Sequence, residues 1–419
     1  MGRFHETVVF CLAIGLACAA CGEKQEPAKG EAAPGKVEAK KLTATELLDA
    51  VITAHGGFEK LQAANSWMSR SKGTYMGMPY KSVNLNRDGV VRMDIVMGDG
   101  EEMSMVMGVD NCWMTSGPVV IDCTKDERAA NRVMVAMSRA MMLSPLKEPS
   151  WKVSLADRAE VDGVKCDALA VENVGTGAKG VLAFDPKTRL LARAEYTAMM
   201  MGQPTRFISW PSDYRELCGI RMAGRWKMTM NDQPYVEEEV LELACGPVED
   251  SALAPPAQVA DGTIVERVVR PFTGACVMMK GPYEGTGEAM GRLMGFLGQK
   301  RLMPVGAPMM TYLEAPPAVK DPQKYETEIC FPVGAPPPPE QQVEGDFTIK
   351  AFGKTRVLAA FGLGPYAETS PRLAGLLGAE LGKRKLTGAG PMRQITYSDP
   401  ESAPPEKLVS EMQIPLAGE

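Results

Sequence analysis

One stretch in the C-terminal part of the chain occurs twice. The first copy runs from Gly281–Tyr283 (GPY) to Glu328–Val333 (EICFPV), and the second from Gly364–Tyr366 (GPY) to Glu411–Leu416 (EMQIPL). The two starts (364 minus 281) and the two ends (411 minus 328) are both displaced by 83 residues. Two copies of this length are too long for solenoid units and too few for a propeller. They predict one domain with pseudo-twofold symmetry and a cleft at the junction of its halves.

Each copy contains the same order of expected elements. A strand leads into the GPY turn, and a helix-like run follows at 289–297 or 373–381. A Gly/Pro turn then precedes an aromatic strand, and a last strand begins near Glu328 or Glu411. The helix would bury its Met/Leu face on a small antiparallel sheet. The pattern predicts an α+β fold with a duplicated strand-helix-strand-strand unit.

These features together resemble the GyrI-like (AraC-type) effector-binding domain over about residues 265–416. The matching motifs are the GPY turn, the G-x-P before an aromatic strand, the Asp-Pro turns at 321–322 and 399–400, and the closing Glu-x-x-x-Pro. The resemblance implies a sensor that holds amphipathic, often cationic, small molecules between its repeats. It also implies that Glu411 pairs with the cation among aromatic rings. A minority of the family hydrolyses reactive small molecules with that acidic residue.

A cleft of this kind defines the candidate ligand-binding residues. A partly desolvated carboxylate needs a cation or a proton, and tyrosine ring faces favour a cation. The predicted ligand-binding residues are Glu411, Glu328, Tyr283, Tyr312, Tyr366 and Tyr397. One alternative is that GPY and Glu-x-x-x-Pro are scaffold features, with the glutamate facing solvent. Another is a hydrolase in which Glu411 acts as general base or acid.

Composition limits the function classes. The 419 residues carry a net charge of −6, and no helix-turn-helix pattern occurs, so no nucleic-acid partner is expected. Of the two histidines, His55 lies at an expected helix C-terminus, where it is predicted to cap or pair with the helix dipole. P-loop, dinucleotide and Cys-x-x-Cys motifs are missing from the mature sequence. No catalytic residue, cofactor or metal is therefore assigned.

The N-terminus has the pattern of an export signal. A short apolar run ends in Cys-Ala-Ala-Cys-Gly, which resembles a bacterial lipobox with Cys21 as the lipid-modified residue. Cys18 is the alternative acceptor, and an ordinary cleaved signal is the alternative to both. A Pro/Ala/Glu/Lys tether follows that cannot bury a core. The sequence predicts a lipoprotein anchored in the bacterial cell envelope and facing the periplasm.

The next segment reads as a large antiparallel sheet with few helices. Thr43 and Glu46 form a capping box before a helical stripe that ends at Gly56-Gly57. Many short strands follow with turns between them, and one helix over about 126–142 interrupts them.

The landmarks of this segment resemble the LolA/LolB-like fold of outer-membrane lipoprotein-sorting proteins. They are AHGGFEKL at 54–61, WM at 113–114, VDGVKC at 161–166, FDPKTRLL at 184–191 and SDYRE at 212–216. The resemblance implies a curved half-barrel sheet with capping helices over an apolar cavity.

Methionines and cysteines leave alternatives open. The many methionines of this segment suit gap-filling in a broad core, a cavity for varied apolar ligands, or Cu(I) binding. Cys112 and Cys123 flank an expected hairpin and form a candidate disulfide, as an exported chain permits. Cys276 and Cys330 are expected to be small buried thiols. The odd cysteine count after Cys21 leaves at least one thiol free.

The expected organisation follows from these segments. The predicted parts are a signal at 1–21, a tether at 22–42, a LolA-like domain at 43–246, a linker at 247–262 and a GyrI-like domain at 263–419 with repeats 265–333 and 346–416. The predicted function is non-catalytic binding of a hydrophobic or amphipathic molecule, cationic ones included. A structural or lipid-handling role through the LolA-like domain is the further alternative.

Overall fold

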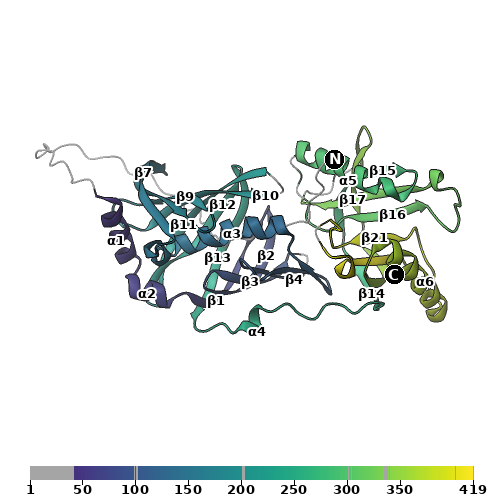
Figure 1. Cartoon of the computed structure of the whole chain (residues 1–419), viewed down its shortest axis with the longest axis horizontal. Helices are drawn as coiled ribbons and strands as arrows, with labels where there is room; N and C mark the ends of the chain where they lie inside the picture. Colours follow the sequence, from purple (N-terminus) through teal and green to yellow (C-terminus); the bar gives the residue numbers. More distant parts are fainter. Residues whose placement is uncertain are drawn as a thin grey trace, which may run out of the picture. The chain divides into compact units, whose positions relative to one another are not determined.

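Two antiparallel sheets make up an α+β structure (Figure 1). The computed structural model describes residues 42–418 except 99, 101, 201, 202, 301, 303, 335–337, 339 and 402. The predicted signal, Cys21 and all but the last residue of the tether lie outside these residues. Packing divides the described residues into two units, with Thr115–Lys125 grouped with the unit that begins at Pro256. No described helix is long and apolar enough to cross a membrane.

The N-terminal unit begins with two helices. α1 (Ala44–Ala54) has the predicted capping box: the Thr43 hydroxyl accepts from the Glu46 amide at 3.2 Å, and the Glu46 carboxylate accepts from the Thr43 amide at 2.8 Å. Its buried face holds leucine, valine and isoleucine side chains at helical spacing. α2 (Phe58–Ala63) follows Gly57, its N-cap residue. Gly57 has a positive φ, a conformation that glycine adopts without steric cost.

The 13-stranded sheet is open, with β6 and β7 at its edges and β1 beside β13. Its strands are β1 (Ser66–Tyr75), β2 (Met78–Arg87), β3 (Val90–Met97), β4 (Glu102–Met107), β5 (Cys112–Ser116), β6 (Val119–Asp122), β7 (Trp151–Val161), β8 (Val164–Asn173), β9 (Lys179–Phe184), β10 (Leu191–Met200), β11 (Gln203–Leu217), β12 (Ile220–Met230) and β13 (Gln233–Cys245). The sequence pattern did not predict β1 or β7. β1 turns serines inward where an apolar alternation is expected, and β7 is a largely exposed edge strand.

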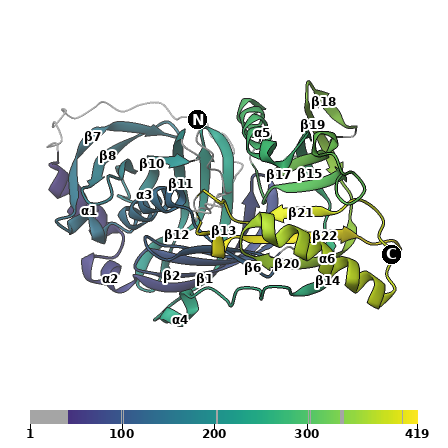
Figure 2. The same ribbon diagram turned by 45° about the vertical axis from the view of Figure 1, so that its right-hand side comes forward.

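The sheet curves around α3 (Lys125–Met141), as Figure 2 shows. η1 (Ser144–Lys147) follows it, with Pro145 in its first turn. The Met137 side chain is fully buried, and a Cβ added at Gly180 would lie 2.4 Å from its terminal methyl carbon. Met93 and Met105 are directly paired across β3 and β4 and are also buried. These three methionines fill the core, as the gap-filling interpretation predicts.

The C-terminal unit contains the predicted repeats, β15-α5-β16-β17 and β20-α6-β21-β22. Its elements are β14 (Ile264–Val269), β15 (Phe272–Lys280), α5 (Thr286–Lys300), β16 (Met309–Glu314), β17 (Glu326–Val333), β18 (Gln342–Glu344), β19 (Phe347–Phe352), β20 (Thr355–Leu363), α6 (Tyr366–Arg384), β21 (Arg393–Thr396) and β22 (Val409–Pro415). The central strand order, β20-β22-β21-β16-β17-β15, reads the same from either end when the repeats are exchanged. β14, β18 and β19 extend the edges. The predicted linker contains α4 (Asp250–Leu253).

Strand alternation gives the nine-stranded sheet two different faces. On the helix-covered face, α5 packs on residues such as Val277 and Ile329, and α6 packs on residues such as Leu358 and Ile414. The other side, called the opposite face below, carries a separate cluster around Cys276, Met309 and Cys330. Whether a side chain meets the helices therefore depends on whether its strand position is odd or even.

Disulfides cross both sheets. Cys276 and Cys330 are directly paired on β15 and β17 and are joined by a disulfide, so the expectation of free thiols at these positions is wrong. A second disulfide joins Cys218 to Cys245. Cys112 and Cys123 are both disulfide-bonded, while their pairing with each other stays a prediction. Among the described cysteines, Cys166 is free and buried, and burial raises the pKa of its thiol.

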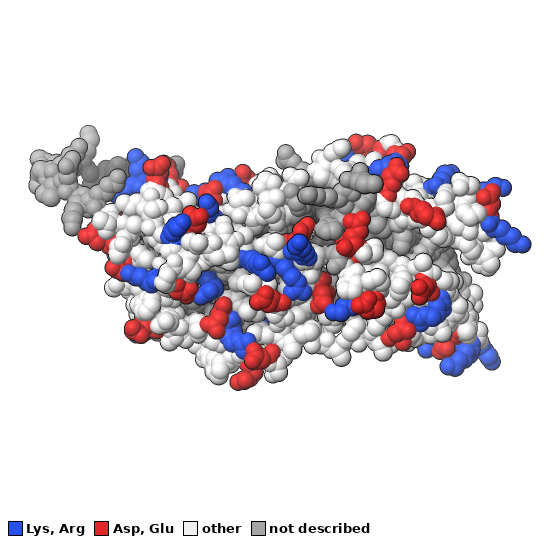
Figure 3. All heavy atoms as spheres, viewed as in Figure 1, with Lys and Arg blue, Asp and Glu red and all other residues white. Residues whose placement is uncertain are grey.

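Charged side chains of both signs are interspersed on the surface seen in Figure 3. Pairs such as Arg158 with Asp167 (2.8 Å) and Arg384 with Glu380 (2.6 Å) have one or both side chains partly in solvent. Each exposed pair contributes at most about 1 kcal/mol to stability. The two sheet cores therefore dominate the stability of the units.

Candidate functional site

Both predicted glutamates lie on the opposite face of the nine-stranded sheet. Glu328 is paired with Thr311 on β16, and Glu411 with Ile395 on β21 and Phe361 on β20. Directly paired residues in antiparallel strands share a face. The glutamates are therefore separated by the sheet from α5 and α6.

Glu411 is fully buried and accepts four hydrogen bonds. Arg267 donates to both carboxylate oxygens, Nε to Oε1 at 2.9 Å and Nη2 to Oε2 at 2.7 Å. The Tyr397 hydroxyl donates to Oε2 at 2.6 Å, and the Gln413 amide donates to Oε1 at 2.8 Å. The predicted neighbourhood of Glu411 and Tyr397 is present, and a solvent-facing Glu411 is wrong. A fork of two parallel bonds to arginine is a strong, geometrically specific ion pair.

Burial changes the proton affinities around Glu411. It raises the pKa of Tyr397 well above its usual value, and the adjacent carboxylate raises it further. Burial lowers the pKa of Arg267, but Glu411 and Tyr397 together outweigh this effect and leave the pKa above its usual value. Tyr397 therefore remains a neutral donor and Arg267 remains charged at physiological pH.

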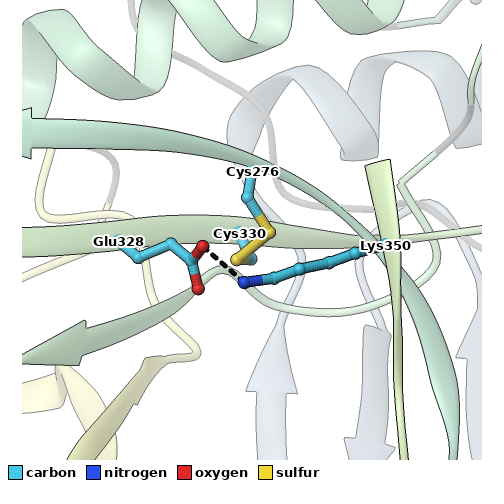
Figure 4. Close-up of a disulfide and its surroundings, with 4 residues drawn as sticks. All are labelled: Cys276, Glu328, Cys330 and Lys350. Carbon is cyan, nitrogen blue, oxygen red and sulfur yellow. Dashed lines mark hydrogen bonds and ion pairs between the residues drawn. A yellow bond between two sulfur atoms is a disulfide. The ribbon is translucent and has the colours of Figure 1, made fainter. Parts of the chain in front are cut away.

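Glu328 occupies the related position of the first repeat beside the disulfide (Figure 4). The Lys350 ammonium lies 2.5 Å from Glu328 Oε1. Potential ligand atoms of Cys276, Glu328 and Cys330 lie within 4.8 Å of one another, as a metal site would require. The disulfide bonds both sulfurs to each other, so no thiolate is available to a metal in this form.

Tyr283 and Tyr312 lie on the helix-covered face, away from the glutamates. The Tyr283 ring, in η2 (Tyr283–Gly285), is 39% exposed and contacts the rings of Tyr312 and Tyr325, with centroids 5.6 and 5.1 Å apart. Tyr312 packs against the hydrophobic clusters under both α5 and α6. Burial raises the pKa of the Tyr312 hydroxyl, so it is a neutral donor. These tyrosines mark the junction of the repeats.

Gln394 brings a buried amide to this junction. Its side chain is 1% exposed, and its Oε1 accepts from the hydroxyls of Tyr312 and, at 3.0 Å, Ser370. Its Nε2 has no hydrogen-bond partner among the described residues. Sequence reasoning did not select Gln394, Ser370 or Tyr325. The available signal was an amide on the helix-covered side of β21, where the alternation predicts an apolar residue.

Tyr366 serves the scaffold. Its hydroxyl donates to the Ser398 carbonyl and accepts from the Ser398 amide at 3.2 Å, which ties the start of α6 to the end of β21. The six predicted residues therefore do not form a single site. Tyr283 and Tyr312 are together on one face, and Glu411, Tyr397 and Glu328 are on the other.

His55 has the structural role that its sequence position predicts. It is the C-cap of α1, and its Nδ1 lies 2.8 Å from the Val51 carbonyl oxygen. Its Nε2 faces the Leu191 amide at 3.4 Å, and the ring packs edge-on to Tyr214. Burial lowers the pKa of His55 and keeps the imidazole neutral.

The N-terminal unit contains a buried carboxyl that the sequence did not single out. Glu238 on β13 and Tyr80 on β2 are both paired with Gly73 of β1, and the Tyr80 hydroxyl donates to Glu238 across that glycine. Burial raises the pKa of Glu238 to about 7, against the opposing effect of the Tyr80 and Ser71 hydroxyls. Glu238 and Tyr80 are among the residues lining a cavity of about 630 Å³. A cavity of about 260 Å³ lies between α2, α3 and η1.

Comparisons with known proteins return solved structures only. No family model and no curated protein matches this chain. A LolA superfamily protein from Nitrosomonas europaea is 12% identical with a TM-score of 0.35, and the match covers 51% of this chain and 99% of that protein. The LolA-like fold read from the sequence is thus among the structural matches.

Other solved structures match about 38% of the chain. The EcmrR C-terminal domain is 11% identical with a TM-score of 0.31 and is covered over 99% of its length. A hydrolase from Listeria innocua is 13% identical with a TM-score of 0.30 and is covered over 94%. The EcmrR chain of an EcmrR–DNA complex is covered over only 57%. These proteins are structures to which part of this chain is similar at low identity and low TM-score.

Proposed function

We propose that this chain binds an amphipathic small molecule, neutral or cationic, on the helix-covered face of the C-terminal unit, without catalysis. The observation that carries the proposal is the Gln394 amide, buried at the junction of the repeats with Nε2 unpartnered among the described residues. A buried polar group without a partner costs about 1–3 kcal/mol. A ligand oxygen that accepts from Nε2 would recover that cost.

The surroundings of Gln394 suit the apolar part of such a ligand. Tyr283 offers a partly exposed ring next to Tyr312. Met290 and Met294 of α5 are partly buried against the hydrophobic cluster under α5, on which Tyr312 also packs. Flexible thioethers and ring faces adapt to varied apolar shapes, and ring faces also attract cations. These residues support recognition of an aromatic or aliphatic body that carries a single polar group.

The proposal contains no catalytic role for Glu411. Both oxygens of its carboxylate are occupied by donors from Arg267, Tyr397 and Gln413. A general base must have a lone pair directed at the proton it takes. A cationic ligand would therefore rest on the tyrosine rings and not on Glu411 or Glu328.

We further propose that the chain works in an oxidising compartment, the bacterial cell envelope. Its described residues include two disulfides with known partners, Cys218–Cys245 and Cys276–Cys330. Such bonds persist outside the reducing cytosol. We include in this proposal that Cys21 is the lipid-modified residue. Labelling of cells with a fatty acid, followed by digestion of the purified protein, would show whether the peptide that contains Cys21 carries lipid.

The test uses two probes of similar shape with the purified full-length chain. Tetraphenylphosphonium is a lipophilic cation, and triphenylphosphine oxide is a neutral molecule with one strong acceptor oxygen. At 100 times its dissociation constant, a ligand adds about 2.7 kcal/mol to the stability of the site. Both probes should raise the melting temperature of the wild type. Tyr283→Ala should weaken the binding of both probes, because the exposed ring is lost.

Gln394→Met separates the amide from the rings. It should weaken phosphine oxide binding about tenfold, which corresponds to about 1.4 kcal/mol, and leave the cation nearly unaffected. Tyr366→Phe is the control, because its hydroxyl bonds to backbone atoms of Ser398 and Val409 and not to the proposed site. If neither probe binds, or if Gln394→Met and Tyr283→Ala bind both as the wild type does, the site is not the one proposed.

A further inference from the structure

A row of polar side chains crosses the opposite face at the centre of the nine-stranded sheet. Glu328 on β17 is paired with Thr311 on β16, Thr311 with Arg393 on β21, and Arg393 with Gln413 on β22. Directly paired residues have Cβ atoms about 4.5–5.5 Å apart. The four side chains therefore form one continuous polar strip across the junction of the two repeats.

Charge is not balanced along this strip. Glu328 is matched by Lys350 at 2.5 Å, and the neighbouring Glu411 is matched by the bidentate Arg267. Among the described residues, the Arg393 side chain lies within no ion-pair distance of a carboxylate, and its Nε is buried without a hydrogen-bond partner. Its guanidinium remains charged in proteins. Glu328 also attracts the Arg393 guanidinium, but its carboxylate is already paired with Lys350. Two carboxylates (Glu328 and Glu411) therefore face three cations (Lys350, Arg267 and Arg393), which leaves one positive charge in excess among these groups.

Two more atoms of the strip are buried and unpartnered among the described residues: Thr311 Oγ1 and Gln413 Oε1. Thr311 is 6% exposed and Gln413 is fully buried. The orientation of the Gln413 amide is determined, because its nitrogen donates to the acceptor-only carboxylate of Glu411. Its oxygen must therefore point elsewhere and needs a donor. Native proteins rarely leave several such groups unsatisfied in one place.

We propose that this strip is a binding site for a small organic hydroxy-carboxylate. The carboxylate accepts from Arg393 Nε and the Thr311 hydroxyl, and the ligand hydroxyl donates to Gln413 Oε1. One carboxylate supplies the single negative charge that the strip lacks. The site lies on the face away from Gln394 and Tyr283, so it does not depend on the function proposed above.

Apolar residues next to the strip determine the body of the ligand. Met309 and Ile395 are paired on the same face, one row along, and belong to the cluster around the disulfide. Met278, paired with Glu328, is 37% exposed. Met309 is already buried, so a ring or short aliphatic group beside the carboxylate would cover the partly exposed Ile395 and Met278. An aryl hydroxy-acid is therefore the ligand class that the face fits.

Three probes of nearly equal size test the assignment by calorimetry on the full-length chain. Mandelate has both the carboxylate and the hydroxyl, phenylacetate lacks the hydroxyl, and 1-phenyl-1,2-ethanediol lacks the carboxylate. Mandelate should bind in the millimolar range or tighter. Phenylacetate should bind about tenfold more weakly, as the loss of one hydrogen bond to a buried acceptor predicts. The diol should show no binding.

Arg393→Met should abolish mandelate binding while the protein stays folded. Its melting temperature should equal or exceed that of the wild type, because an unpaired, partly desolvated charge is replaced by an apolar chain. Arg356→Gln is the matched control. It removes one cation from the neighbouring β20, where Arg356 pairs with the partly exposed Glu266, and should leave mandelate affinity unchanged.

Three results would overturn the assignment. The first is a wild type that binds none of the probes at millimolar concentration. The second is equal binding of mandelate and the diol, which would remove the role of the charge. The third is an Arg393→Met protein that keeps its mandelate affinity within about twofold, a difference of less than about 0.5 kcal/mol.

Discussion

Glu238 is one residue at which protonation and folding are coupled in the N-terminal unit. Burial raises its pKa from an ordinary 4.5 to about 7, so the folded protein holds this proton more tightly than the unfolded chain. Such a group contributes stability that is complete below about pH 4.5 and is lost as the pH rises through about 7. His55 has the opposite sign, because burial lowers its pKa and its contribution is lost as the pH falls below 6.5.

We expect Glu238→Gln to abolish the part of the pH dependence of stability that is due to this carboxyl group. At pH 8 the variant should be more stable than the wild type, by on the order of 3 kcal/mol as an upper limit, because no buried charge has to form. At pH 4.5 the two should be equal within about 1 kcal/mol. Urea unfolding followed by tryptophan fluorescence at both pH values measures the difference, and the shared His55 contribution cancels.

Glu237→Gln is the control for this measurement. Glu237 is the next residue on β13, half exposed and 3.7 Å from Lys227, so its removal should change stability little at either pH. A Glu238→Gln protein that is no more stable than the wild type at pH 8 would show that Glu238 is ionised in the fold at little cost.

At the scale of the element, the approach of β1 to β13 depends on one glycine. A Cβ added at Gly73 would lie 2.1 Å from the Glu237 carbonyl oxygen, closer than any real contact. Gly73 also separates Tyr80 from Glu238 on the neighbouring strands. The β1–β13 pairing joins the first strands of the sheet to the last, so a distortion there affects its centre.

We expect Gly73→Ala to destabilise the N-terminal unit by about 1–3 kcal/mol, because the strands must move apart to admit the methyl group. Gly295→Ala in α5 should do the reverse. A Cβ there meets nothing within 4 Å, and alanine is favoured over glycine in a helix by about 1 kcal/mol. Thermal unfolding of both variants gives the signs. A neutral Gly73→Ala would mean that β1 and β13 are not in this register.

Strand register has the same importance for the candidate sites. Tyr312 and Glu328 belong to paired strands, yet Tyr312 is opposite Thr327, one residue before the glutamate. A difference of one residue moves a side chain to the other face of a sheet. For this reason the tyrosines and the glutamates that appear together in the repeat are parted in the fold.

At the scale of the whole molecule, the two units differ in their tryptophan content and in their disulfides. All five tryptophans occur between residues 67 and 226, within the 13-stranded sheet unit. The Cys276–Cys330 bond closes a stretch of 54 residues in the other unit. By loop-closure entropy such a bond is worth about 4 kcal/mol.

We therefore expect the Cys276→Ala/Cys330→Ala protein to lower the melting transition of the C-terminal unit while leaving the transition seen by tryptophan fluorescence unchanged. Circular dichroism reports both transitions. The Cys218→Ala/Cys245→Ala protein should show the converse, a lower tryptophan transition. A single transition that shifts equally in both proteins would show that the units unfold together.

Local sequence pattern accounts for several features of the fold. The 83-residue repeat predicted β15-α5-β16-β17 and β20-α6-β21-β22, and the capping box at Thr43 and the C-cap at His55 are present. These features depend on residues near one another in the chain, where spacing and turn chemistry suffice. β1 escaped prediction because its inward serines break the apolar alternation on which strand prediction rests.

Which distant groups come into contact depends on the three-dimensional fold. Arg267 reaches Glu411 from 144 residues away, Lys350 of β19 reaches Glu328 from outside the repeat that contains Glu328, and Cys276 bonds to Cys330 across the β15–β17 pair. Each partnership follows from strand order and register, which place distant residues side by side and set the face on which they stand. A local pattern contains neither quantity, since both are set by the burial of the whole sheet against its helices.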